Sequence, residues 1–411
     1  MTVPPRPTVI EETAENDMIP QGPPLTGLRV LDLTTFLSGP YATQILADLG
    51  ADVVKVEPPA GDSSRAIPPH FIDGDSAYYL SVNRNKRSLV LDLKTPEGSS
   101  RLRELADVAD IVIENFRPGI LDRLGLNYHD LTATNPGVIW CSISGFGQDG
   151  PYKERPAYDM IVQALSGGMS LTGLPDGPPV RSGIPLGDLS AGMYAVIGVL
   201  SALHQRGPEG RGRRLDISML DCQISMLSYQ GVYHLLAGVT PGRQGRAHDS
   251  IPTYRAFTAA DGVDVMVTAN TDGMWRGLCE VLGVPELLDD PRFTDGSARQ
   301  ANREKLGPLL EKAFVARPAA DWLPDLHAAR VPAAPVNAVP DALADPQVRH
   351  RHMVIDVPED AGRPPLHLLG NPVKFADGGR DRDITRPPRL GEHGDDVVRD
   401  WLTESEKGSS R

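Results

Sequence analysis

The sequence predicts an α/β protein with a large domain built around a parallel sheet and a second, smaller α+β domain. Two observations lead to this fold class. Between residues 28 and 143, short apolar runs of strand length alternate with segments of helical length. From about residue 253, the pattern changes to a hairpin followed by helices. Alternating strands and helices are typical of a parallel sheet with helices on both faces.

The first half of the chain supplies the predicted strands. Apolar runs at 28–34 (LRVLDLT) and 53–56 flank a helix predicted over 39–49. The same pattern recurs further along the chain, with strands predicted at 88–93 (SLVLDL), 110–115 (DIVIEN) and 138–143 and a helix beginning near Pro96. This part of the chain is therefore expected to form one continuous sheet.

The second half of the chain is predominantly helical. Apolar residues recur at helical spacing over 191–204 and 219–236. The apolar stretch 191–203 is shorter than a membrane span, so we expect a buried core helix and no membrane anchor. Asp261-Gly262 lies between two apolar runs, which predicts a hairpin turn. Helices are predicted near 274–282 and 302–314, and the proline-rich segment 331–340 is predicted to be a connector.

These expectations divide the chain into six parts. They are a flexible N-terminal arm (1–24), the first part of the large domain (25–236), a loop or linker (237–252), the small domain (253–330), a connector that returns to the large domain (331–402) and a tail (403–411).

Composition excludes several classes of function. The chain has 54 acidic and 41 basic residues and a net charge of −13, which argues against binding to nucleic acid or to an anionic membrane. Its three cysteines, Cys141, Cys222 and Cys279, are too far apart to suggest a metal site or a disulfide framework. The first 24 residues do not resemble a signal peptide. We therefore expect a cytoplasmic protein without a metal.

A cluster of basic residues, NRNKRS, stands out in this acidic chain. It contains Arg84, Lys86 and Arg87, with Arg65 upstream and Lys94 downstream. One interpretation is a solvated turn before a strand. The other is a phosphate-binding site, because Arg and Lys supply the donors that phosphate oxygens need. Dinucleotide-binding, P-loop and serine-hydrolase motifs do not occur in the sequence.

Two acidic positions are candidates for chemistry. Asp188 lies in PLGDLSAGM, at the entry of the most apolar helix, where it either caps the helix or acts as a nucleophile that the helix N-terminus keeps ionised. Tyr158 and Asp159 follow the glycine-rich segment GFGQDGPYKERPA. They either begin the next helix or belong to a site at the carboxyl ends of the strands.

Four segments together resemble the class III CoA-transferases. They are GLRVLDLTTFLSGPYATQILADLGADVVKVEPPAGDSSR, NRNKRSLVLDLKTPEG, ADIVIENFRPGILDRLGL and NPGVIWCSISGFGQDGP, and the similarity extends over residues 25–402. The resemblance implies a Rossmann-like large domain, an interlocked homodimer, acyl-CoA and small carboxylic acids as substrates, and no permanently bound cofactor.

The resemblance also implies roles for individual residues. Asp188 matches the family's catalytic aspartate, which attacks an acyl-CoA thioester to give an aspartyl anhydride and then an aspartyl-CoA thioester. Tyr158 matches a family tyrosine close to the catalytic aspartate, Asp159 replaces an acidic neighbour that is often glutamate, and both are expected to shape the acyl pocket. The family's CoA contacts match Leu37, Ser38, Leu91, Lys94, Asn115, Phe116 and Arg123.

Departures from the family pattern concern the substrate. Pro58 replaces a basic residue of some formyl-CoA transferases, and their four-glycine lid is absent. Arg243 and Arg246 in the nearest loop are candidates for binding the carboxylate of a dicarboxylic acyl group. The alternative function is a 2-methylacyl-CoA racemase, although the usual histidine base of that branch is replaced by Tyr158. A protein that only binds CoA is a third interpretation, which the intact Asp188 segment disfavours.

Overall fold

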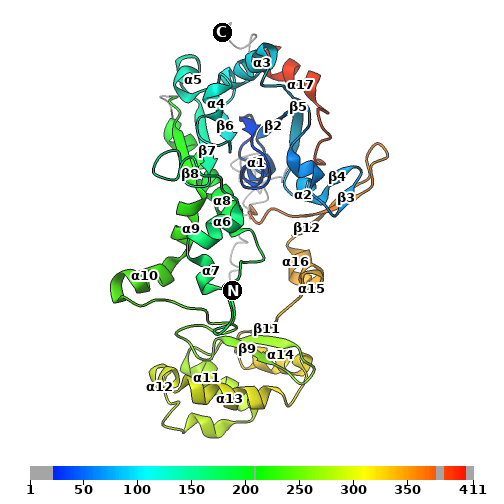
Figure 1. The fold of residues 1–411 in the computed structure, drawn as a ribbon. Helices are drawn as coiled ribbons and strands as arrows, with labels where there is room; N and C mark the ends of the chain where they lie inside the picture. Colours follow the sequence, from blue (N-terminus) through cyan, green and yellow to red (C-terminus); the bar gives the residue numbers. More distant parts are fainter. Residues whose placement is uncertain (1–21, 208–209, 376–383, 404–411) are drawn as a thin grey trace, which may run out of the picture. The chain divides into compact units, whose positions relative to one another are not determined.

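The computed structural model describes residues 22–207, 210–375 and 384–403 (Figure 1). The predicted arm up to residue 21 and the predicted tail from residue 404 lie outside the described residues. The chain divides into two compact units, the first from Met1–Ser166, Gly183–Ser228 and His352–Arg411 and the second from Gly167–Ser182 and Tyr229–Arg351. The second unit thus contains segments that we expected in the large domain, the linker and the connector.

A six-stranded parallel sheet forms the centre of the first unit, in the order β5-β2-β1-β6-β7-β8. This is the doubly wound order, in which the chain starts in the middle of the sheet and builds outward in both directions. The strands are β1 (Arg29–Leu33), β2 (Asp52–Glu57), β5 (Lys86–Val90), β6 (Ile111–Glu114), β7 (Ile139–Ser144) and β8 (Arg214–Ser218). The predicted parallel sheet is confirmed.

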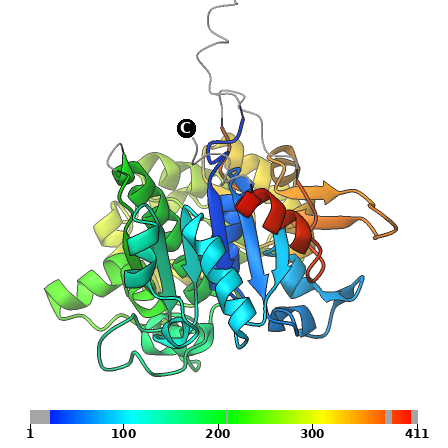
Figure 2. The ribbon, with the colours of Figure 1, turned by 90° about the horizontal axis from the view of Figure 1, so that it is seen from above.

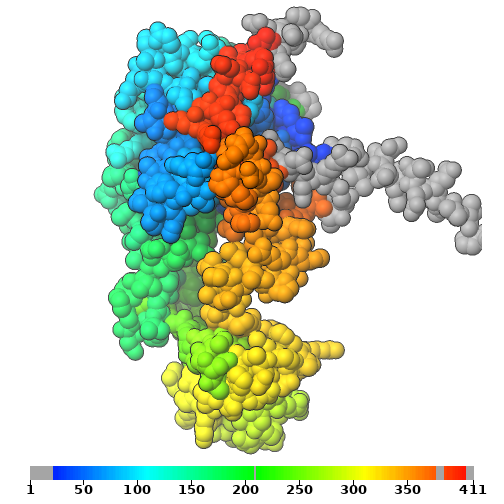
Figure 3. Space-filling model, turned by 90° about the vertical axis from the view of Figure 1, so that its right-hand side faces the viewer, coloured from blue at the N-terminus to red at the C-terminus, as the bar shows by residue number. Residues whose placement is uncertain are grey.

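Helices cover both faces of this sheet, as Figure 2 shows from above. One face packs against α1 (Ser38–Asp48), α6 (Asp159–Leu165), α8 (Leu186–Arg206) and α9 (Met219–Met226). The other packs against α3 (Pro96–Asp107), α4 (Ile120–Arg123), α5 (Tyr128–Thr134), α17 (Gly394–Val398) and the π-helical turn η3 (Arg399–Thr403). In Figure 3 the C-terminal elements, in red, lie against the blue and cyan segments of β5 and α3.

Helix α8 is longer than the predicted 191–204. It has 21 residues, and an 18-residue window within it has a mean hydropathy of 1.5, so it is long and apolar enough to cross a membrane by length and composition alone, and the prediction that it is too short is wrong. Within the first unit it packs against α1 and β7. Gly192 permits this close packing, because a Cβ there would lie 2.8 Å from the carbonyl oxygen of Ser38. The expectation of a core helix is consistent with this packing.

Three elements differ from the predictions. Strand β5 begins at Lys86 and ends at Val90, earlier than the predicted 88–93, so the basic cluster enters the sheet. Strand β8 was missed because its exposed Arg214 and Asp216 hide the apolar alternation of this edge strand. The helix predicted over 219–236 breaks at Ser228, whose φ of 49° is left-handed. It forms α9 and α10 (Ser228–Ala237).

Smaller elements complete the first unit. They are η1 (Ser63–Ala66), β3 (Phe71–Ile72), β4 (Asp75–Ser76), α2 (Ala77–Leu80), β12 (Val354–Val357) and β13 (Leu366–Leu369).

The second unit has a three-stranded antiparallel sheet of β9 (Arg255–Thr258), β10 (Asp264–Val267) and β11 (Ala333–Pro335). The predicted Asp261-Gly262 hairpin is confirmed. Strand β11 lies within 331–340, which we predicted to be a connector. The prediction is wrong for the residues of β11, because they pair with β10. The remaining elements are α7 (Gly168–Leu171), most of α10, α11 (Asp272–Leu282), η2 (Pro285–Leu288), α12 (Gly296–Ala301), α13 (Arg303–Phe314), α14 (Ala319–Ala328), α15 (Val339–Ala344) and α16 (Pro346–His350).

Candidate active site

The chain order reverses between β1 and β6, and polar side chains gather at the carboxyl ends of these strands. Asn115, which follows β6, accepts a hydrogen bond from the backbone N–H of Thr35 (2.9 Å) and donates one to the Thr35 carbonyl (2.8 Å). It also contacts the hydroxyl of Ser38 at 3.5 Å. In doubly wound sheets this crevice is the usual place for a ligand.

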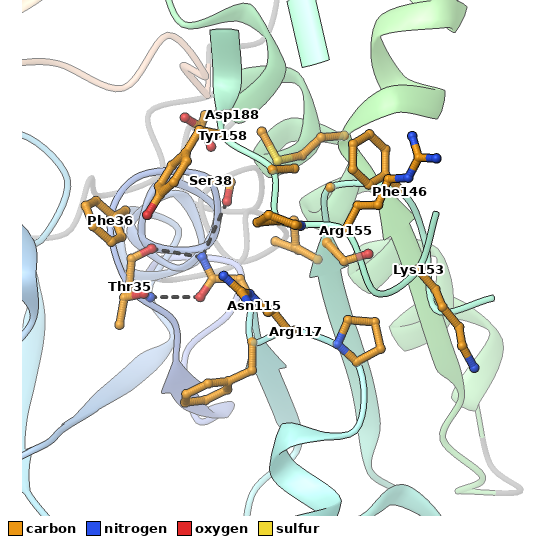
Figure 4. A pocket seen from close by; sticks show the side chains of 18 of the residues that line it. Thr35, Phe36, Ser38, Asn115, Arg117, Phe146, Lys153, Arg155, Tyr158 and Asp188 are labelled. Carbon is orange, nitrogen blue, oxygen red and sulfur yellow. Dashed lines mark hydrogen bonds between the residues drawn. The ribbon is translucent and has the colours of Figure 1, made fainter. Parts of the chain in front are cut away.

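A cavity of about 290 Å³ opens at this point of the first unit (Figure 4). It is lined by Thr35, Phe36, Ser38, Tyr78, Asn115, Phe116, Arg117, Pro118, Ile143, Ser144, Gly145, Phe146, Lys153, Arg155, Pro156, Ala157, Tyr158, Asp188 and Met219. Five of the predicted site residues are therefore brought together: Ser38, Asn115, Phe116, Tyr158 and Asp188.

Asp188 enters the cavity from the first turn of α8. The helix begins at Leu186, and its N-cap is Pro185, which makes no side-chain capping bond. Asp188 is thus the third residue of the helix, and the interpretation that its side chain occupies the N-cap is wrong.

The electrostatic state of Asp188 also differs from the expectation that the helix N-terminus holds it ionised. Burial, and after it the charge of Asp159, raise the pKa of Asp188 to about 7, while a hydrogen bond from Ser38 opposes this change. Removal from water destabilises the ionised carboxylate more than the hydrogen-bond donors near it stabilise it. The carboxyl group therefore stays protonated to a higher pH than an ordinary aspartate.

Asp159 holds the start of α8 in place rather than lining the cavity. It is the first residue of α6, after Tyr158 at the N-cap. One carboxylate oxygen accepts the backbone N–H of Gly187 (2.8 Å), next to Asp188, and the other accepts the amide of Gln163 (2.7 Å). Gly187 allows this approach, since a Cβ there would lie 3.0 Å from the carboxylate. Asp159 thus caps α8 from another helix.

Two tyrosines adjoin Asp188. The exposed ring of Tyr158 packs edge-on against Phe36, with ring centroids 5.9 Å apart. Tyr78, in α2, was missed by the sequence analysis. Burial, followed by the negative charges of Asp188, Asp159 and Asp62, raises the pKa of Tyr78 to about 12, so this side chain is a neutral hydrogen-bond donor at physiological pH.

A buried network fixes the loop between β1 and α1. Asp32 accepts the backbone N–H of Thr34 (2.9 Å), and Lys55 donates to the Thr34 carbonyl (2.7 Å). The backbone N–H of Phe36, which has a left-handed φ of 64°, points at Asp62 (3.4 Å). The three partners lie in β1, in β2 and after β2, and together they fix the backbone of the loop. This fixed backbone holds Phe36 and Ser38 at the cavity.

The predicted phosphate-binding cluster is instead part of the interior. Arg84 pairs with Asp48, Lys86 with Asp32, Arg87 with Asp52 and Asp400, and Arg65 with Glu57 and Asp75. Neither a solvated turn nor an open phosphate site describes these side chains, because carboxylates of the same unit already occupy their donors.

Different basic residues surround the cavity. Arg117, Lys153 and Arg155 are exposed side chains that line it, and the sequence analysis singled out none of them. Lys153 and Arg155 lie in the segment GFGQDGPYKERPA, just before Tyr158 and Asp159. A glycine-rich segment that follows a strand often forms part of a site, and this position could have marked the two basic residues as candidates.

The other predicted site residues do not line this cavity. Leu37 is buried, Lys94 and Arg123 are exposed, and Leu91 is partly buried. In the second unit, Arg246 pairs with Asp264 (2.6 Å), and Arg243 donates to the carbonyl of Leu174 (3.2 Å). No group of three or more potential metal ligands occurs among the described residues.

Comparison with known proteins agrees with this geometry. The family model CoA-transferase family III matches residues 25–394. This chain belongs to CoA-transferase family III. It is 40% identical to succinate–glutarate CoA-transferase of Agrobacterium fabrum over 94% of this chain and 98% of the relative. It is 43% identical to acetyl-CoA:oxalate CoA-transferase of Acetobacter aceti over 91% and 95%, respectively.

A solved structure gives the same result for the fold. The crystal structure of a CaiB/BaiF family protein from Brucella suis superposes with a TM-score of 0.83 at 41% identity, covering 93% of this chain and all of that one. The predicted resemblance is confirmed, and the protein is a CoA-transferase that acts on an acyl-CoA and a carboxylic acid.

Proposed function

We propose that this CoA-transferase works through covalent chemistry on Asp188. The observation that carries the proposal is a carboxyl group that lines a cavity and is removed from water without a cation beside it: among the described residues, no lysine or arginine contributes to its pKa. A carboxylate that has lost part of its hydration is a better nucleophile than one in water, once it is ionised.

The reaction then runs in four displacements. The Asp188 carboxylate attacks the thioester carbon of the donor, the C–S bond breaks, and CoA leaves as the thiolate from an aspartyl anhydride. The thiolate attacks the Asp188 carbonyl carbon and expels the donor acid, which gives an aspartyl-CoA thioester. The acceptor carboxylate and the thiolate repeat these two steps in reverse order. The thioester bond is conserved throughout, provided that water is kept out.

Other residues of the cavity support these steps. A neutral phenol at Tyr78 and the hydroxyl of Ser38 are donors close to the point where negative charge develops on the substrate carbonyl oxygen. Tyr158, whose exposed ring packs against Phe36 at the cavity, is proposed to cover the acyl group. Asp159 acts as a positioning residue through Gly187.

The CoA portion of the substrate is proposed to contact the residues that the resemblance names. Ser38, Asn115 and Phe116 line the cavity, which supports their assignment. Leu37, Leu91, Lys94 and Arg123 are proposed to contact more distant parts of CoA. A cytoplasmic location and an interlocked homodimer are proposed on the family resemblance alone.

The test is covalent trapping. The protein is incubated with succinyl-CoA, trapped with hydroxylamine or borohydride and digested with trypsin, and the peptide 182–206 is sequenced by mass spectrometry. The expected result is a modification on Asp188 in the wild type and no modification of this peptide in Asp188→Asn. An unmodified peptide with several acyl-CoAs, together with exchange of an α-proton of 2-methylacyl-CoA into deuterated water, would refute the covalent mechanism in favour of the racemase.

A further inference from the structure

Glu114 is a buried acid that has no part in the proposed reaction steps. It is the last residue of β6 and is 6% exposed. One carboxylate oxygen accepts the backbone N–H of Phe116, two residues further along the chain (2.9 Å). Ser142 of β7 forms a second hydrogen bond with the carboxyl group. The Ser142 hydroxyl hydrogen is available for this bond because its oxygen accepts the indole N–H of Trp140 (2.9 Å).

The two residues that follow Glu114 line the cavity of Asp188. Asn115 is held by its two hydrogen bonds with Thr35, which Figure 4 draws as dashed lines. The backbone N–H of Phe116 is held by Glu114. A change at Glu114 therefore acts on a proposed CoA contact without touching Asp188.

The first strand of the sheet contains the same contact in a different electrostatic setting. Asp32 of β1 accepts the backbone N–H of Thr34, again two residues further on (2.9 Å), and pairs with Lys86. The nearby positive charge keeps Asp32 ionised. Among the described residues, no lysine or arginine forms an ion pair with Glu114. The charge of Glu114 is therefore free to change with pH, whereas that of Asp32 is not.

Burial raises the pKa of Glu114 to about 7, so this side chain loses its proton at a higher pH than an ordinary glutamate. The hydrogen bonds of Ser142 and Phe116 and the charge of Arg214 on β8 oppose this change, and Asp122 on α4 adds to it. A second cavity of the first unit, of about 560 Å³, reaches the side chain and gives it access to water. The other titratable groups that face Glu114 or line this cavity are Cys141 of β7, Tyr128 and His129 of α5, and Arg117.

The charge of Glu114 sets how strongly it holds Phe116. An ionised carboxylate accepts a charge-assisted hydrogen bond, which is roughly twice as strong as one between neutral groups. We propose that Glu114 is a positioning residue for CoA binding, whose ionised carboxylate fixes the backbone of Phe116 at the cavity and whose protonation weakens this contact. This inference rests on the proposed function, in which Phe116 contacts CoA. CoA should therefore bind more tightly as pH rises through the range in which Glu114 loses its proton.

The experiment measures the dissociation constant of CoA by calorimetry at pH 6 and pH 8.5. The parent protein is Asp188→Asn, so that ionisation of Asp188 does not contribute. Glu114→Gln is introduced because it keeps an oxygen that can accept the Phe116 N–H but cannot ionise. His129→Gln is the matched control, since it removes another titratable side chain that lines the second cavity and is exposed. Ionisation of CoA itself is the same with every protein and cancels in the comparison.

The ratio of the dissociation constants at pH 6 and pH 8.5 is expected to be about three- to tenfold larger in the parent than in Glu114→Gln, because the two proteins differ by one charge-assisted hydrogen bond. His129→Gln should keep the ratio of the parent. An equal ratio in the parent and in Glu114→Gln would overturn the inference. A smaller ratio in the parent would also overturn it, because repulsion between the carboxylate and CoA would then outweigh the positioning.

A second measurement separates positioning from a general loss of structure. In the otherwise wild-type enzyme at pH 8.5, Glu114→Gln should raise the succinyl-CoA concentration for half-maximal modification of Asp188 by about three- to tenfold and leave the maximal rate unchanged. A lower maximal rate at an unchanged half-maximal concentration would contradict the positioning role. If Phe116→Ala binds CoA as tightly as the parent, the proposed CoA contact is wrong and this inference is wrong with it. A wild type that forms no Asp188 adduct would overturn the covalent mechanism alone, since the affinity for CoA does not depend on it.

Discussion

Two aspartates of the first unit, Asp32 and Asp188, show how differently the same side chain behaves in two places. Asp32 is fully buried in β1, where its carboxylate contacts Lys86 at 3.1 Å and the hydroxyls of Thr34 and Thr43 at 2.5 and 2.6 Å. Burial alone would raise its pKa, but Lys86 and Lys55 together with these hydrogen bonds lower the pKa of Asp32 to about 2. This carboxylate is ionised and neutralised inside the protein.

Asp188 is only partly buried, yet burial and Asp159 raise its pKa to about 7 because no cation compensates. The comparison shows that the partners, rather than burial itself, separate a structural charge from a reactive one. A buried carboxylate with cations and donors on every oxygen has no lone pair left for chemistry. One that lines a cavity and has few partners retains its reactivity at a cost in stability.

The largest expected effect concerns activity. Asp188→Asn should lower kcat/KM for CoA transfer by at least about 10³-fold, because the amide cannot form the anhydride. Steady-state transfer from succinyl-CoA to glutarate measures this loss. Asp221→Asn, which changes an exposed carboxylate at the start of α9, should retain wild-type activity. Activity of Asp188→Asn within tenfold of the wild type would mean that the nucleophile lies elsewhere.

The corresponding change at Asp32 should act on stability. Asp32→Asn leaves Lys86 and Lys55 without their shared counter-charge, so the free energy of unfolding should fall by about 3–5 kcal/mol. Urea unfolding at pH 7 measures it. Glu104→Gln breaks an exposed pair with Arg101 on α3 and should lower it by less than about 1 kcal/mol. Equal small losses in both variants would show that the buried pair contributes no more than a surface one.

The same distinction explains which parts of the fold could be predicted from the sequence. Strands β1, β2, β6 and β7 are buried on both faces and appear as continuous apolar runs, so they were found. Strand β8 lies at the sheet edge with exposed charges, and its pattern resembles a loop. The break before α10 occurs at Ser228, which has a left-handed φ. No glycine or proline stands at this position to predict a break.

The residues that line the cavity were predictable partly from their positions in the sequence and partly from the family resemblance. Asp188 and Tyr158 were candidates from the sequence pattern itself, whereas Ser38 and Asn115 were named by the resemblance alone. Neither interpretation of the cluster NRNKRS, a solvated turn or a phosphate site, describes it, because the sequence does not reveal its partners, Asp48, Asp52 and Asp32, which lie 36, 35 and 54 residues away. Lys153 and Arg155 were overlooked for the converse reason, since isolated charges in a loop resemble solvated surface until the fold shows the cavity beside them.

A smaller effect should appear in the pH dependence of stability. The folded-state pKa of Asp188 is raised, so its favourable contribution is complete below about pH 4 and is lost as pH rises through about 7. Asp188→Asn lacks this loss and should be more stable than the wild type by about 4 kcal/mol at pH 8 but by only about 1 kcal/mol at pH 4.5. Urea midpoints at both pH values measure the difference.

A second buried acid, Glu114, also affects the pH dependence of stability, and the comparison of wild type and variant cancels its effect. Burial also raises the pKa of Glu114 to about 7, but this residue is present in both proteins, so the difference between their curves isolates Asp188. If the stability of the wild type and of the variant changes equally with pH, ionisation of Asp188 does not destabilise the fold. Asp188 and Asp32 would then differ in their contacts but not in the free energy of their charged forms.

The smallest expected effect separates the two roles of Asp159. Asp159→Asn removes the negative charge that helps to raise the pKa of Asp188 but keeps an oxygen that can accept the N–H of Gly187. The pH midpoint for Asp188 modification, measured at subsaturating acyl-CoA so that it reports the free enzyme, should fall by roughly 0.5 pH unit. Asp221→Asn should leave the midpoint unchanged. If Asp159→Asn lowers the rate at every pH without moving the midpoint, Asp159 acts on Asp188 only by holding the first turn of α8.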